Sequence, residues 1–547
     1  MNILFIMYDQ LRFDYLSCTG HPYIKTPNFD KIASMGVNFS NTYVQSPICG
    51  ASRMSFYTGR YTSSHGAHWN GFPLRVGEMT LGDHLRNLGM DCWLIGKTHM
   101  QADAAGMERL GLSPDSIIGA RQAECGFDVW KRDDGLWAQG PDGIYGEGDK
   151  SYNEFLKSKG YDGENPWADY ANASLENGEI ASGWFLKNAD KPANIREEDS
   201  ETPWLTSEAI NFMKHTKEPW CAHVSYIKPH WPYIVPSPYH KMYGQNQILP
   251  ATRHPIEKEN THPVYNAFLN NKIAKAFQND AARAKVIPAY MGLIKQCDDQ
   301  LERIINYLEE TGEIKDTVIV LTSDHGDYLG DHWLGEKDLF HDPSVKIPMI
   351  IYDPRASADK TRGTTCSNLV ESIDLSATFI EMAGGTVPDH IIEGKSLIPF
   401  LNGTPVTNWR EVVFSEYDYS ITPMAKELGV EDKDARLFMV FDGRYKLIHA
   451  EGGFRPILFD LESDPDEFQD LGKQDNHKEI IKILYAHLAQ WGLRMSQRVT
   501  KSAQDIHNMR GAAARKGILP FLVDGSEVEP ELISKYLGQA RKNYLDE

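Results

Sequence analysis

The sequence predicts an α/β fold in which a mainly parallel sheet is sandwiched by helices and is followed by a smaller C-terminal antiparallel-sheet subdomain. Several apolar, β-branched or aromatic runs are continuous rather than alternating, which is typical of strands buried on both faces. Helical patterns separate these runs, as in a mainly parallel sheet. From about residue 408 onward, short strand-like segments follow one another instead. The predicted strands of the main sheet are residues 3–8, 92–95, 221–227, 318–321 and 347–352.

The helical stretches that best fit this pattern are residues 27–35, 81–88 and 290–309. In open α/β sheets, ligands bind outside the carboxyl ends of the strands. We therefore expect the chemistry of this chain among the residues that directly follow its predicted strands.

The chain divides into three parts. Residues 1–405 form the large α/β domain, with an insertion at about residues 131–203 that is rich in Gly, Asn and Asp and is expected to be a lid or disordered. Residues 406–499 form the small α+β subdomain, with the strand-like segments "REVVFSEYDY", "RLFMVFDGRYKLIHA" and "PILFDL" before a helix at 477–495. Residues 500–547 are a tail that would suit an oligomerisation arm, so we expect a homo-oligomer, a dimer or tetramer.

The composition excludes several classes of partner. The formal net charge of the 547 residues is −20. Nucleic acids and anionic membranes require a basic protein surface, so neither is an expected partner. An anionic substrate would have to be attracted by local positive charge.

The compartment is predicted from the cysteines and from the first residues. The seven cysteines are scattered without paired spacing, which favours a reducing compartment. They are Cys18, Cys49, Cys92, Cys125, Cys221, Cys297 and Cys366. The opening "MNILFIMYDQ" has the pattern of a strand rather than a signal peptide, and no apolar run is long enough to span a membrane. We predict a cytoplasmic protein.

Two predicted strands end in candidate metal ligands. Asp9 and Gln10 follow the first strand, and Asp324 and His325 follow the strand at 318–321. Two carboxylates, an amide oxygen and an imidazole at one sheet edge form an oxygen-rich set, which favours Ca²⁺, Mg²⁺ or Mn²⁺ over zinc. The alternative is that each aspartate only caps the following helix.

Cys49 stands in "SPICGASRMSFYTGRY", at the predicted N-terminus of a helix that Gly59 ends. A free cysteine is usually a small buried apolar residue. Here the helix N-terminus favours negative charge, and Arg53 lies one turn further along the same face. The pattern therefore predicts an anion site that contains a nucleophile.

The segment that begins at Cys49 resembles that of a known protein family. The stretch "CGASRMSFYTGRY" is similar to the activation signature of the sulfatases, Cys-x-(Pro or Ala)-x-Arg followed by Thr-Gly, in which the cysteine is oxidised to formylglycine. Further segments resemble sulfatases in the family's order, over about residues 1–495. They are "TPNFDKIASMGVNFSNTYVQSPIC", "TLGDHLRNLGMDCWLIGKTHM", "SYIKPHWPY", "DHGDYLGDHWLGEKDLFHDPSVKIPMII" and "LFDLESDPDEFQDL". The resemblance implies an alkaline-phosphatase-like fold with residues 1–405 as its catalytic domain.

The resemblance also implies a ligand set and a nucleophile. One divalent cation, Ca²⁺ first and Mn²⁺ or Mg²⁺ as alternatives, would be held by Asp9, Gln10, Asp324, His325 and the oxidised Cys49. The partners would be a formylglycine-generating maturation enzyme and a small anionic ester substrate. The formylglycine hydrate would attack sulfur, pass through a covalent sulfo-enzyme intermediate and then release sulfate.

Other residues match the substrate-binding positions of the family. Arg53 would fix the hydrate, Lys97 and His99 of "GKTHM" would contact the hydrate and the sulfate, and His230 and Lys337 would bind the ester and help the alcohol leave. Judged singly, each of these could be a structural or surface residue.

The resemblance also implies two proton acceptors and one further substrate contact. Asp324 is expected to accept the proton of the nucleophile, and His99 the proton released when the hemiacetal collapses. Asn70 is a further expected substrate contact. The other histidines considered are expected to be structural or near the substrate; they are His65, His68, His332 and His341.

The chain departs from the common sulfatase pattern at three positions, and two of these departures indicate a particular branch of the family. Ala51 stands where proline is most common in the activation motif, Gln10 replaces a second aspartate, and His325 stands where many members carry Asn. The last two resemble the branch that contains arylsulfatases, choline sulfatases and phosphonate monoester hydrolases.

The expected activity is hydrolysis of aryl or small alkyl sulfate esters, because phosphonate hydrolases of this branch tend to lack the pair Lys97 and His99. Phosphonate monoester or phosphodiester hydrolysis is the alternative, since such esters also carry one negative charge. A non-catalytic anion- or metal-binding protein is the rival from another class.

Overall fold

A main sheet of eight strands organises the chain. The computed structural model describes residues 1–113, 115–135, 151–216, 219–259, 261–494 and 500–510. Within these residues the strand order is β12-β2-β11-β9-β1-β8-β4-β5, and β1 pairs in parallel with both β8 and β9. The strands are β1 (Asn2–Tyr8), β2 (Val37–Phe39), β4 (Asp91–Gly96), β5 (Asp128–Arg132), β8 (Trp220–Tyr226), β9 (Thr317–Thr322), β11 (Met349–Tyr352) and β12 (Thr364–Cys366).

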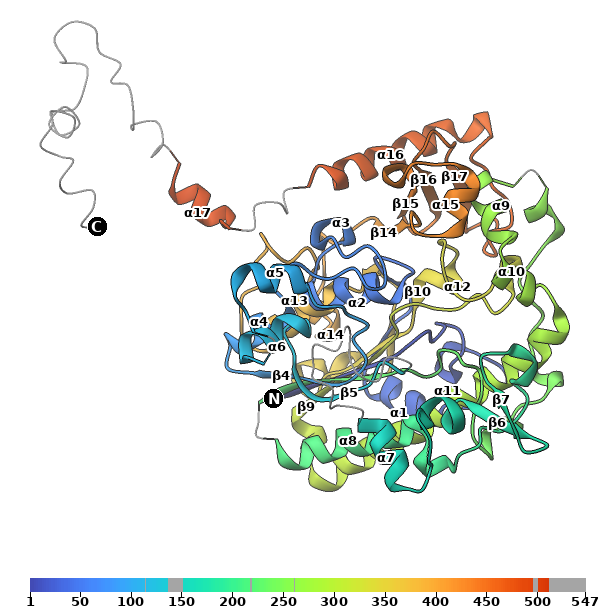
Figure 1. Cartoon of the computed structure of the whole chain (residues 1–547). Helices are drawn as coiled ribbons and strands as arrows, with labels where there is room; N and C mark the ends of the chain where they lie inside the picture. Colours follow the sequence, from blue (N-terminus) through green and yellow to red (C-terminus); the bar gives the residue numbers. More distant parts are fainter. Residues whose placement is uncertain (114, 136–150, 217–218, 260, 495–499, 511–547) are drawn as a thin grey trace, which may run out of the picture.

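Helices cover both faces of this sheet because its central strands are apolar on both sides. Side chains of β1 alternate between two separate cores, with Phe5 in one and Ile6 in the other. The first core includes residues of α2 (Cys49–Thr58), α4 (Leu81–Arg86) and α13 (Asp374–Met382). The second includes residues of α1 (Pro27–Met35), α8 (Glu201–His215) and α11 (Asp280–Thr311), which lie on the opposite side of the sheet (Figure 1).

The predicted α/β class is confirmed, with differences at particular elements. The predicted helix 27–35 has the bounds of α1, and the strand at 3–8 is one residue longer at its start. The segment 347–352 contains β11, which pairs antiparallel with β9. The helix predicted at 290–309 begins ten residues earlier, because α11 continues through Pro288.

The described part of the insertion, residues 151–203, is folded rather than a loose surface excursion. It contains α7 (Ser151–Ser158), the hairpin of β6 (Ala173–Glu176) and β7 (Glu179–Ser182), and the start of α8. Tyr152, Leu156 and Trp167 are buried in the same core as α8 and α11. This differs from the expectation of a disordered segment, whereas a lid stays a prediction; residues 136–150 lie outside the described residues.

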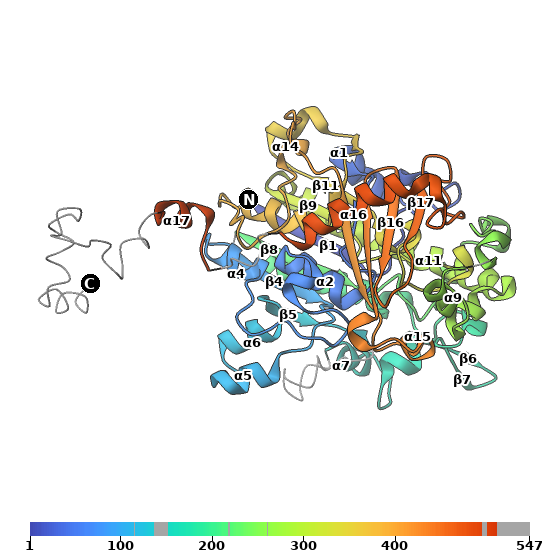
Figure 2. The same cartoon turned by 90° about the horizontal axis from the view of Figure 1, so that it is seen from above.

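The C-terminal subdomain is a four-stranded antiparallel sheet, as expected. Its strands are β14 (Val413–Asp418), β15 (Arg436–Phe441), β16 (Tyr445–Ala450) and β17 (Ile457–Asp460). Figure 2 shows α16 (Lys478–Gly492) lying along this sheet, where Leu484 packs on Val440 and Leu447. The expected oligomerisation arm falls mostly on residues 511–547, outside the described residues.

The remaining elements are short. A second small sheet has the order β10 (Lys346–Ile347), β3 (Thr42–Tyr43) and β13 (Val370–Glu371). The other helices are α3 (Thr62–His65), α5 (Ala104–Leu110), α6 (Ile117–Ala123), α9 (Pro263–Leu269), α10 (Lys272–Phe277), α12 (Asp342–Val345), α14 (Ile398–Leu401), α15 (Pro423–Leu428) and α17 (Ala503–Asn508). In the part of the chain that the structure describes, no helix combines the length and apolar character needed to cross a bilayer.

Candidate active site at the carboxyl edge of the main sheet

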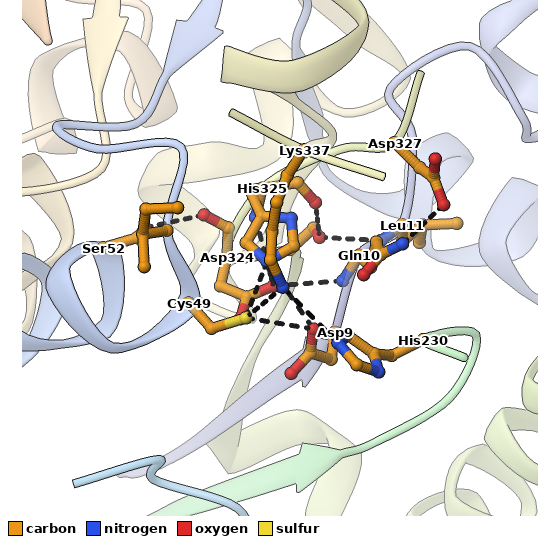
Figure 3. Close-up of polar contacts among 12 residues, drawn as sticks. Asp9, Gln10, Leu11, Cys49, Ser52, His230, Asp324, His325, Asp327 and Lys337 are labelled. Atoms are coloured by element: carbon orange, nitrogen blue, oxygen red, sulfur yellow. Dashed lines mark hydrogen bonds and ion pairs between the residues drawn. The ribbon is translucent and has the colours of Figure 1, made fainter. Parts of the chain in front are cut away.

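Four buried side chains converge where β1 and β9 end. One possible ligand atom from each of Asp9, Cys49, Asp324 and His325 lies within 4.8 Å of all the others. Figure 3 shows these side chains pointing toward one another from three different segments. The strand-end aspartates therefore meet at one edge of the sheet, as the sequence predicts.

Gln10 offers an unpaired oxygen to this group. Its backbone is in the left-handed region, with φ 65°, and its N–H donates to Asp324 Oδ1 over 3.0 Å. The side-chain nitrogen donates to Asp327 Oδ2 and to the hydroxyl of Tyr233. The side-chain oxygen Oε1 is buried and accepts no hydrogen bond from the described residues. Such an orphaned oxygen is costly unless a cation or water satisfies it.

His325 is oriented in the way expected of a metal ligand. Its Nδ1 lies 2.8 Å from the carbonyl oxygen of Gly326, so Nδ1 carries the proton and donates. Nε2 then turns toward Asp9 Oδ1 and Asp324 Oδ1, at 3.8 and 3.9 Å. Backbone hydrogen bonds of this kind fix the tautomer of ligating histidines.

These donors fit a divalent cation. Two carboxylates, the orphaned Gln10 oxygen and an imidazole nitrogen form a mainly oxygen set, which suits Ca²⁺, Mg²⁺ or Mn²⁺. Asp9, Gln10, Asp324 and His325 would hold the ion, with the oxidised side chain of Cys49 beside them.

Cys49 lies at the start of α2, which ends at Gly59 in the left-handed conformation. Its Sγ is 2.8 Å from Lys337 Nζ and 2.9 Å from His325 Nε2 (Figure 3). In an oxidised site the aldehyde carbon would keep the Cβ position, and its oxygen would take the place of Sγ. That oxygen would stand between a cationic side chain and the proposed ion.

Arg53 organises the carboxylates rather than facing the thiol. Its guanidinium donates to Asp324 Oδ2 at 2.8 Å and to Asp9 Oδ2 at 3.1 Å, and it is completely buried. It also donates to the carbonyl oxygen of Lys97 and to Ser225 Oγ. These bonds use most of its donors, so Arg53 sets the positions of both carboxylates.

Lys97 and His99 follow β4 and approach the same group. Lys97 Nζ forms an ion pair with Asp9 Oδ2 at 2.6 Å. His99 has φ 56°, and its backbone N–H donates to Asp134 Oδ1 at 3.0 Å. Its Nδ1 is buried without a hydrogen-bond partner among the described residues, so this atom can still take a proton or a ligand.

His230 and Lys337 form a contact pair beside Cys49. Nδ1 of His230 lies 2.7 Å from the carbonyl oxygen of Trp231 and therefore donates to it. Its Nε2 is 3.4 Å from Lys337 Nζ, which also contacts Cys49. His230 Nε2 is thus the ring atom left for proton transfer.

The charges in the site act strongly on one another. Burial alone would raise the pKa of Asp9, but Lys97, His230 and Arg53 hold it well below its usual value. Burial and Asp9 oppose ionisation of the Cys49 thiol, yet Lys337 and His325 outweigh them and lower its pKa. The site therefore favours negative charge at the position of Cys49.

The pKa values of His230 and His99 shift downward, whereas that of Lys337 shifts upward. Burial lowers the pKa of His230 well below its usual value, and Lys337 adds to this effect. Burial likewise lowers the pKa of His99, with a contribution from Lys97. Burial would lower the pKa of Lys337, but Cys49 and Asp9 raise it above its usual value.

Asn70 and the remaining histidines are placed outside this group of atoms. Asn70 Oδ1 accepts the backbone N–H of Gly50 at 2.8 Å, so it caps the N-terminus of α2. His65 Nε2 lies 3.0 Å from Ser55 Oγ and is structural, and His68 contributes no ligand atom to the four-residue group. His332 and His341 belong to a second cluster with Glu257, described below.

Sequence reasoning missed the residues that support the ligands. Asp327 and Tyr233 hold the amide of Gln10, Ser52 Oγ donates to the carbonyl oxygen of Asp324 at 2.6 Å, and Ser225 accepts from Arg53. The repeated acidic pattern "SDHGDYLGD" was the one available signal, and it points to Asp327. Tyr233 and Ser225 carry no such signal.

Comparisons with known proteins agree with this fold. The family model described as "Sulfatase" matches residues 1–385, and that of "N-sulphoglucosamine sulphohydrolase, C-terminal" matches residues 330–493. The chain is thus a hydrolase of the alkaline phosphatase superfamily. Within that superfamily it belongs to the sulfatase family, which confirms the resemblance seen in the sequence.

Individual relatives span nearly the whole chain. The multifunctional alkaline phosphatase superfamily protein PehA of Trinickia caryophylli is 29% identical, covering 91% of this chain and 96% of the relative. An arylsulfatase of Clostridium perfringens is 28% identical, covering 88% and 92%. The crystal structure of a phosphonate monoester hydrolase of Agrobacterium radiobacter matches with a TM-score of 0.76 and 26% identity, covering 89% and 94%.

Proposed function

We propose that this protein hydrolyses sulfate monoesters of aryl or small alkyl alcohols, with formylglycine made from Cys49 and one divalent cation, Ca²⁺ before Mn²⁺ or Mg²⁺. The observation that carries the proposal is the position of Cys49 Sγ, buried within 3 Å of both Lys337 Nζ and His325 Nε2. An oxyanion at this position is stabilised by fixed positive charge that needs no reorganisation.

The cation, the formylglycine hydrate and the charged residues of the site have different roles in the proposed reaction. The bound cation would lower the pKa of the attacking hydroxyl, and the formylglycine hydrate would supply that hydroxyl and a second one that later expels sulfate. Arg53 holds Asp9 and Asp324 in place for the ion. Lys97 and Lys337 supply positive charge toward the sulfate oxygens.

We assign the proton transfers to His230, Asp324 and His99. His230 Nε2, with Lys337 beside it, is placed to pass a proton to the leaving alcohol oxygen, a step of the kind that contributes about 10² to 10⁴-fold. Asp324 would take the proton of the nucleophile, and the unpartnered Nδ1 of His99 is available when the hydrate collapses.

Maturation of Cys49 has to precede folding. Cys49, Gly50 and Ala51 are all buried in α2, where no modifying enzyme reaches them. We therefore propose that a formylglycine-generating enzyme acts on the unfolded segment and accepts Ala51 in place of proline. The cytoplasmic location and the homo-oligomer stay predictions.

Phosphonate monoester or phosphodiester hydrolysis at the same site is the second candidate. The similarity to a phosphonate monoester hydrolase and to a multifunctional relative supports it. Lys97, at 2.6 Å from Asp9, and His99 favour sulfate, because phosphonate hydrolases of this branch tend to lack this pair.

Two measurements test the proposal. In protein from its native host, the peptide with Cys49 should be about 18 Da lighter than the thiol form, as expected for an aldehyde. The kcat/KM for 4-nitrophenyl sulfate should exceed that for 4-nitrophenyl phenylphosphonate. Active protein with an unmodified thiol would refute the nucleophile, and a large phosphonate preference would reverse the two candidates.

A further inference from the structure

A cavity lies away from the candidate active site. Its volume is about 290 Å³, and it is bounded by the residues before α9, by the segment that carries His332 and His341, and by residues after β16. Figure 1 shows α9 beside the small C-terminal sheet. Neither Cys49 nor Lys337 lines this cavity. A ligand here would not compete directly with the ester.

Two stacked histidines form its polar wall. The rings of His332 and His341 lie 3.9 Å apart between centroids, with an angle of 9° between their planes. Both residues line the cavity, although only 2% and 3% of their surface is exposed. Polar side chains buried to this degree normally have partners for all their polar atoms.

Each ring has a partner on one nitrogen only. His332 Nδ1 donates to Glu257 Oε1 at 2.7 Å. His341 Nδ1 is 2.9 Å from the hydroxyl of Tyr328. No hydrogen bond between described residues uses either Nε2, and neither Nε2 is sealed from solvent. The Nε2 atoms are therefore what these two side chains can offer to a ligand.

The partner of His341 settles where its proton lies. Tyr328 is fully buried, and its hydroxyl accepts the backbone N–H of His341. Within the described residues the one acceptor in reach of the hydroxyl proton is His341 Nδ1. His341 therefore accepts at Nδ1 and carries its own proton on Nε2, which makes that atom a donor.

His332 presents a second donor beside it. The carboxylate of Glu257 at Nδ1 raises the pKa of His332 despite burial. In the protonated ring, Nε2 also bears a hydrogen. Two N–H groups on parallel rings suit the paired oxygens of a carboxylate or sulfate.

A metal ion fits this arrangement poorly. An ion bound by imidazole lies close to the plane of the ring, along the lone pair of the nitrogen. Two parallel rings stacked 3.9 Å apart share no such point. Nε2 of His341 also carries a proton. The cluster of Glu257, His332 and His341 therefore favours an anion, although it could be taken for a metal site by residue type.

The acidic residues around the cavity are mostly neutralised. Glu257 is bound to His332, Glu467 pairs with Lys446 at 2.7 Å, and Asp470 pairs with Arg455 at 2.6 Å. Glu259 is exposed at the rim, where Lys473 also lines the opening. The charge around the two Nε2 atoms therefore does not exclude an anion.

Six apolar side chains also line the wall, beside polar ones such as Thr261, His262, Gln469 and Gln474. Ile256, Leu269, Leu334, Ile457, Phe459 and Phe468 line the cavity. Cavities with mostly apolar walls and a few convergent polar groups bind small organic ligands. A fully hydrated inorganic anion would leave these walls unused.

We propose that this cavity binds a small organic carboxylate, whose oxygens accept hydrogen bonds from Nε2 of His332 and His341 and whose apolar body packs against Phe459 and Phe468. This site is independent of the proposed sulfate ester hydrolysis. His332 and His341 flank Lys337 in the chain, so an occupied cavity would also stiffen the segment that carries Lys337.

Crystals of the full chain soaked in 4-bromobenzoate test the location. The bromine should give an anomalous peak in the cavity, with the carboxylate within hydrogen-bond distance of both Nε2 atoms. A bromine peak only at the candidate active site, or none, would overturn the proposal. Because the wild-type protein is used, the result does not depend on how a variant folds.

Calorimetric titration with benzoate tests the role of the donors. His341→Phe keeps a stacked ring but removes the N–H, so binding should weaken by about tenfold or more. The matched control His215→Phe makes the same change on the exposed surface of α8 and should bind like wild type. Equal affinity in His341→Phe and wild type would refute the donor role.

Two further titrations decide the class of ligand. Benzoate should bind more tightly than inorganic sulfate, because sulfate cannot use the apolar walls. Sulfate binding at least as tight as benzoate would overturn the organic assignment. Tight Zn²⁺ binding that is lost in His341→Phe would overturn the anion assignment.

Discussion

At the residue scale, Gln10 is the most informative side chain of the site. Its nitrogen is used by Asp327 and Tyr233, which leaves its oxygen unpaired and turned to the ligand group. An amide is therefore required here, because a carboxylate would face the carboxylate of Asp327 in a buried place. This explains why a residue other than the family's common aspartate stands at this position.

Replacing Gln10 by methionine should weaken the cation site. Gln10→Met keeps the length of the side chain but removes the ligand oxygen, so affinity for Mn²⁺ should fall by about tenfold or more. Electron paramagnetic resonance of chelator-treated protein titrated with Mn²⁺ measures this. The control Tyr233→Phe removes one bond to the amide nitrogen but keeps the oxygen, so its loss should be smaller. Equal Mn²⁺ affinity in Gln10→Met and wild type would show that this oxygen is not a ligand.

The candidate site could be predicted from the sequence only where a single segment carries the signal. Asp9 and Asp324 were predicted because each follows a recognisable strand, and the structure brings them together. Helical spacing predicts Arg53 on the same helix face as Cys49, but it does not predict that the guanidinium binds the two aspartates. Contacts between distant segments, such as Tyr233 with Asp327, leave no local pattern.

At the element scale, long apolar strands and helices with clear ends were predictable, and short elements were not. The bounds of α1 follow directly from the sequence, since Pro27 suits a first helical turn and Gly36 ends the helix. The strands β2 and β3 have three and two residues and exist through pairing with distant segments. No local preference identifies strands of that length.

Lys446 on β16 ties the C-terminal sheet to the start of α12. It is fully buried, and its Nζ lies 2.7 Å from both Asp342 Oδ1 and Glu467 Oε1. Lys446→Met would leave the buried carboxylate of Glu467 and the partly buried carboxylate of Asp342 without this cation. The free energy of unfolding at pH 8, from urea titration, should fall by about 3–5 kcal/mol.

A matched control and a pH series accompany this prediction. Lys346→Met removes a partly exposed partner 3.5 Å from Asp342, and it should cost about 1 kcal/mol or less. In wild type, burial is outweighed by Lys446, which lowers the pKa of Asp342 to about 2, below its usual value of 3.8. The stabilisation is therefore present above pH 3.8 and is lost as the pH falls toward 2.

In Lys446→Met the pKa shift of Asp342 has the opposite sign. Without the lysine, burial raises the pKa of both Asp342 and Glu467, so lowering the pH from 8 to 5 should reduce the deficit relative to wild type. A deficit of equal size at both pH values would show that lost packing, and not unpaired charge, causes the destabilisation.

At the scale of the whole molecule, the C-terminal sheet contacts the segment that carries Lys337 of the candidate site. The α/β class and the antiparallel subdomain were both predictable, because burial on two faces and short successive strands leave different patterns in the sequence. The docking of the subdomain on the large domain was not predictable, because it depends on single contacts between distant residues. One of them joins Tyr417 of β14 to Asp338, next to Lys337, through a hydrogen bond of 2.7 Å.

Tyr417 should therefore affect catalysis from the other sheet. Glu336, Asp338 and Leu339 all have positive φ, a conformation that costs free energy and depends on surrounding contacts. Removing the hydroxyl in Tyr417→Phe releases Asp338 and lets Lys337 move from Cys49. We expect kcat for 4-nitrophenyl sulfate to fall by about tenfold, with Mn²⁺ affinity unchanged, because a bond to a charged group contributes about 1.5–3 kcal/mol.

The neighbouring tyrosine provides the control for this change. The hydroxyl of Tyr419 is buried without a hydrogen-bond partner among the described residues, and both tyrosines pack against Phe268. Tyr419→Phe removes the same atom from the same region without breaking a bond, so its kcat should equal that of wild type. If both variants lost the same activity, the cause would be general packing of the subdomain. A loss confined to Tyr417→Phe means that the C-terminal sheet positions Lys337, and the subdomain is then part of the catalytic apparatus.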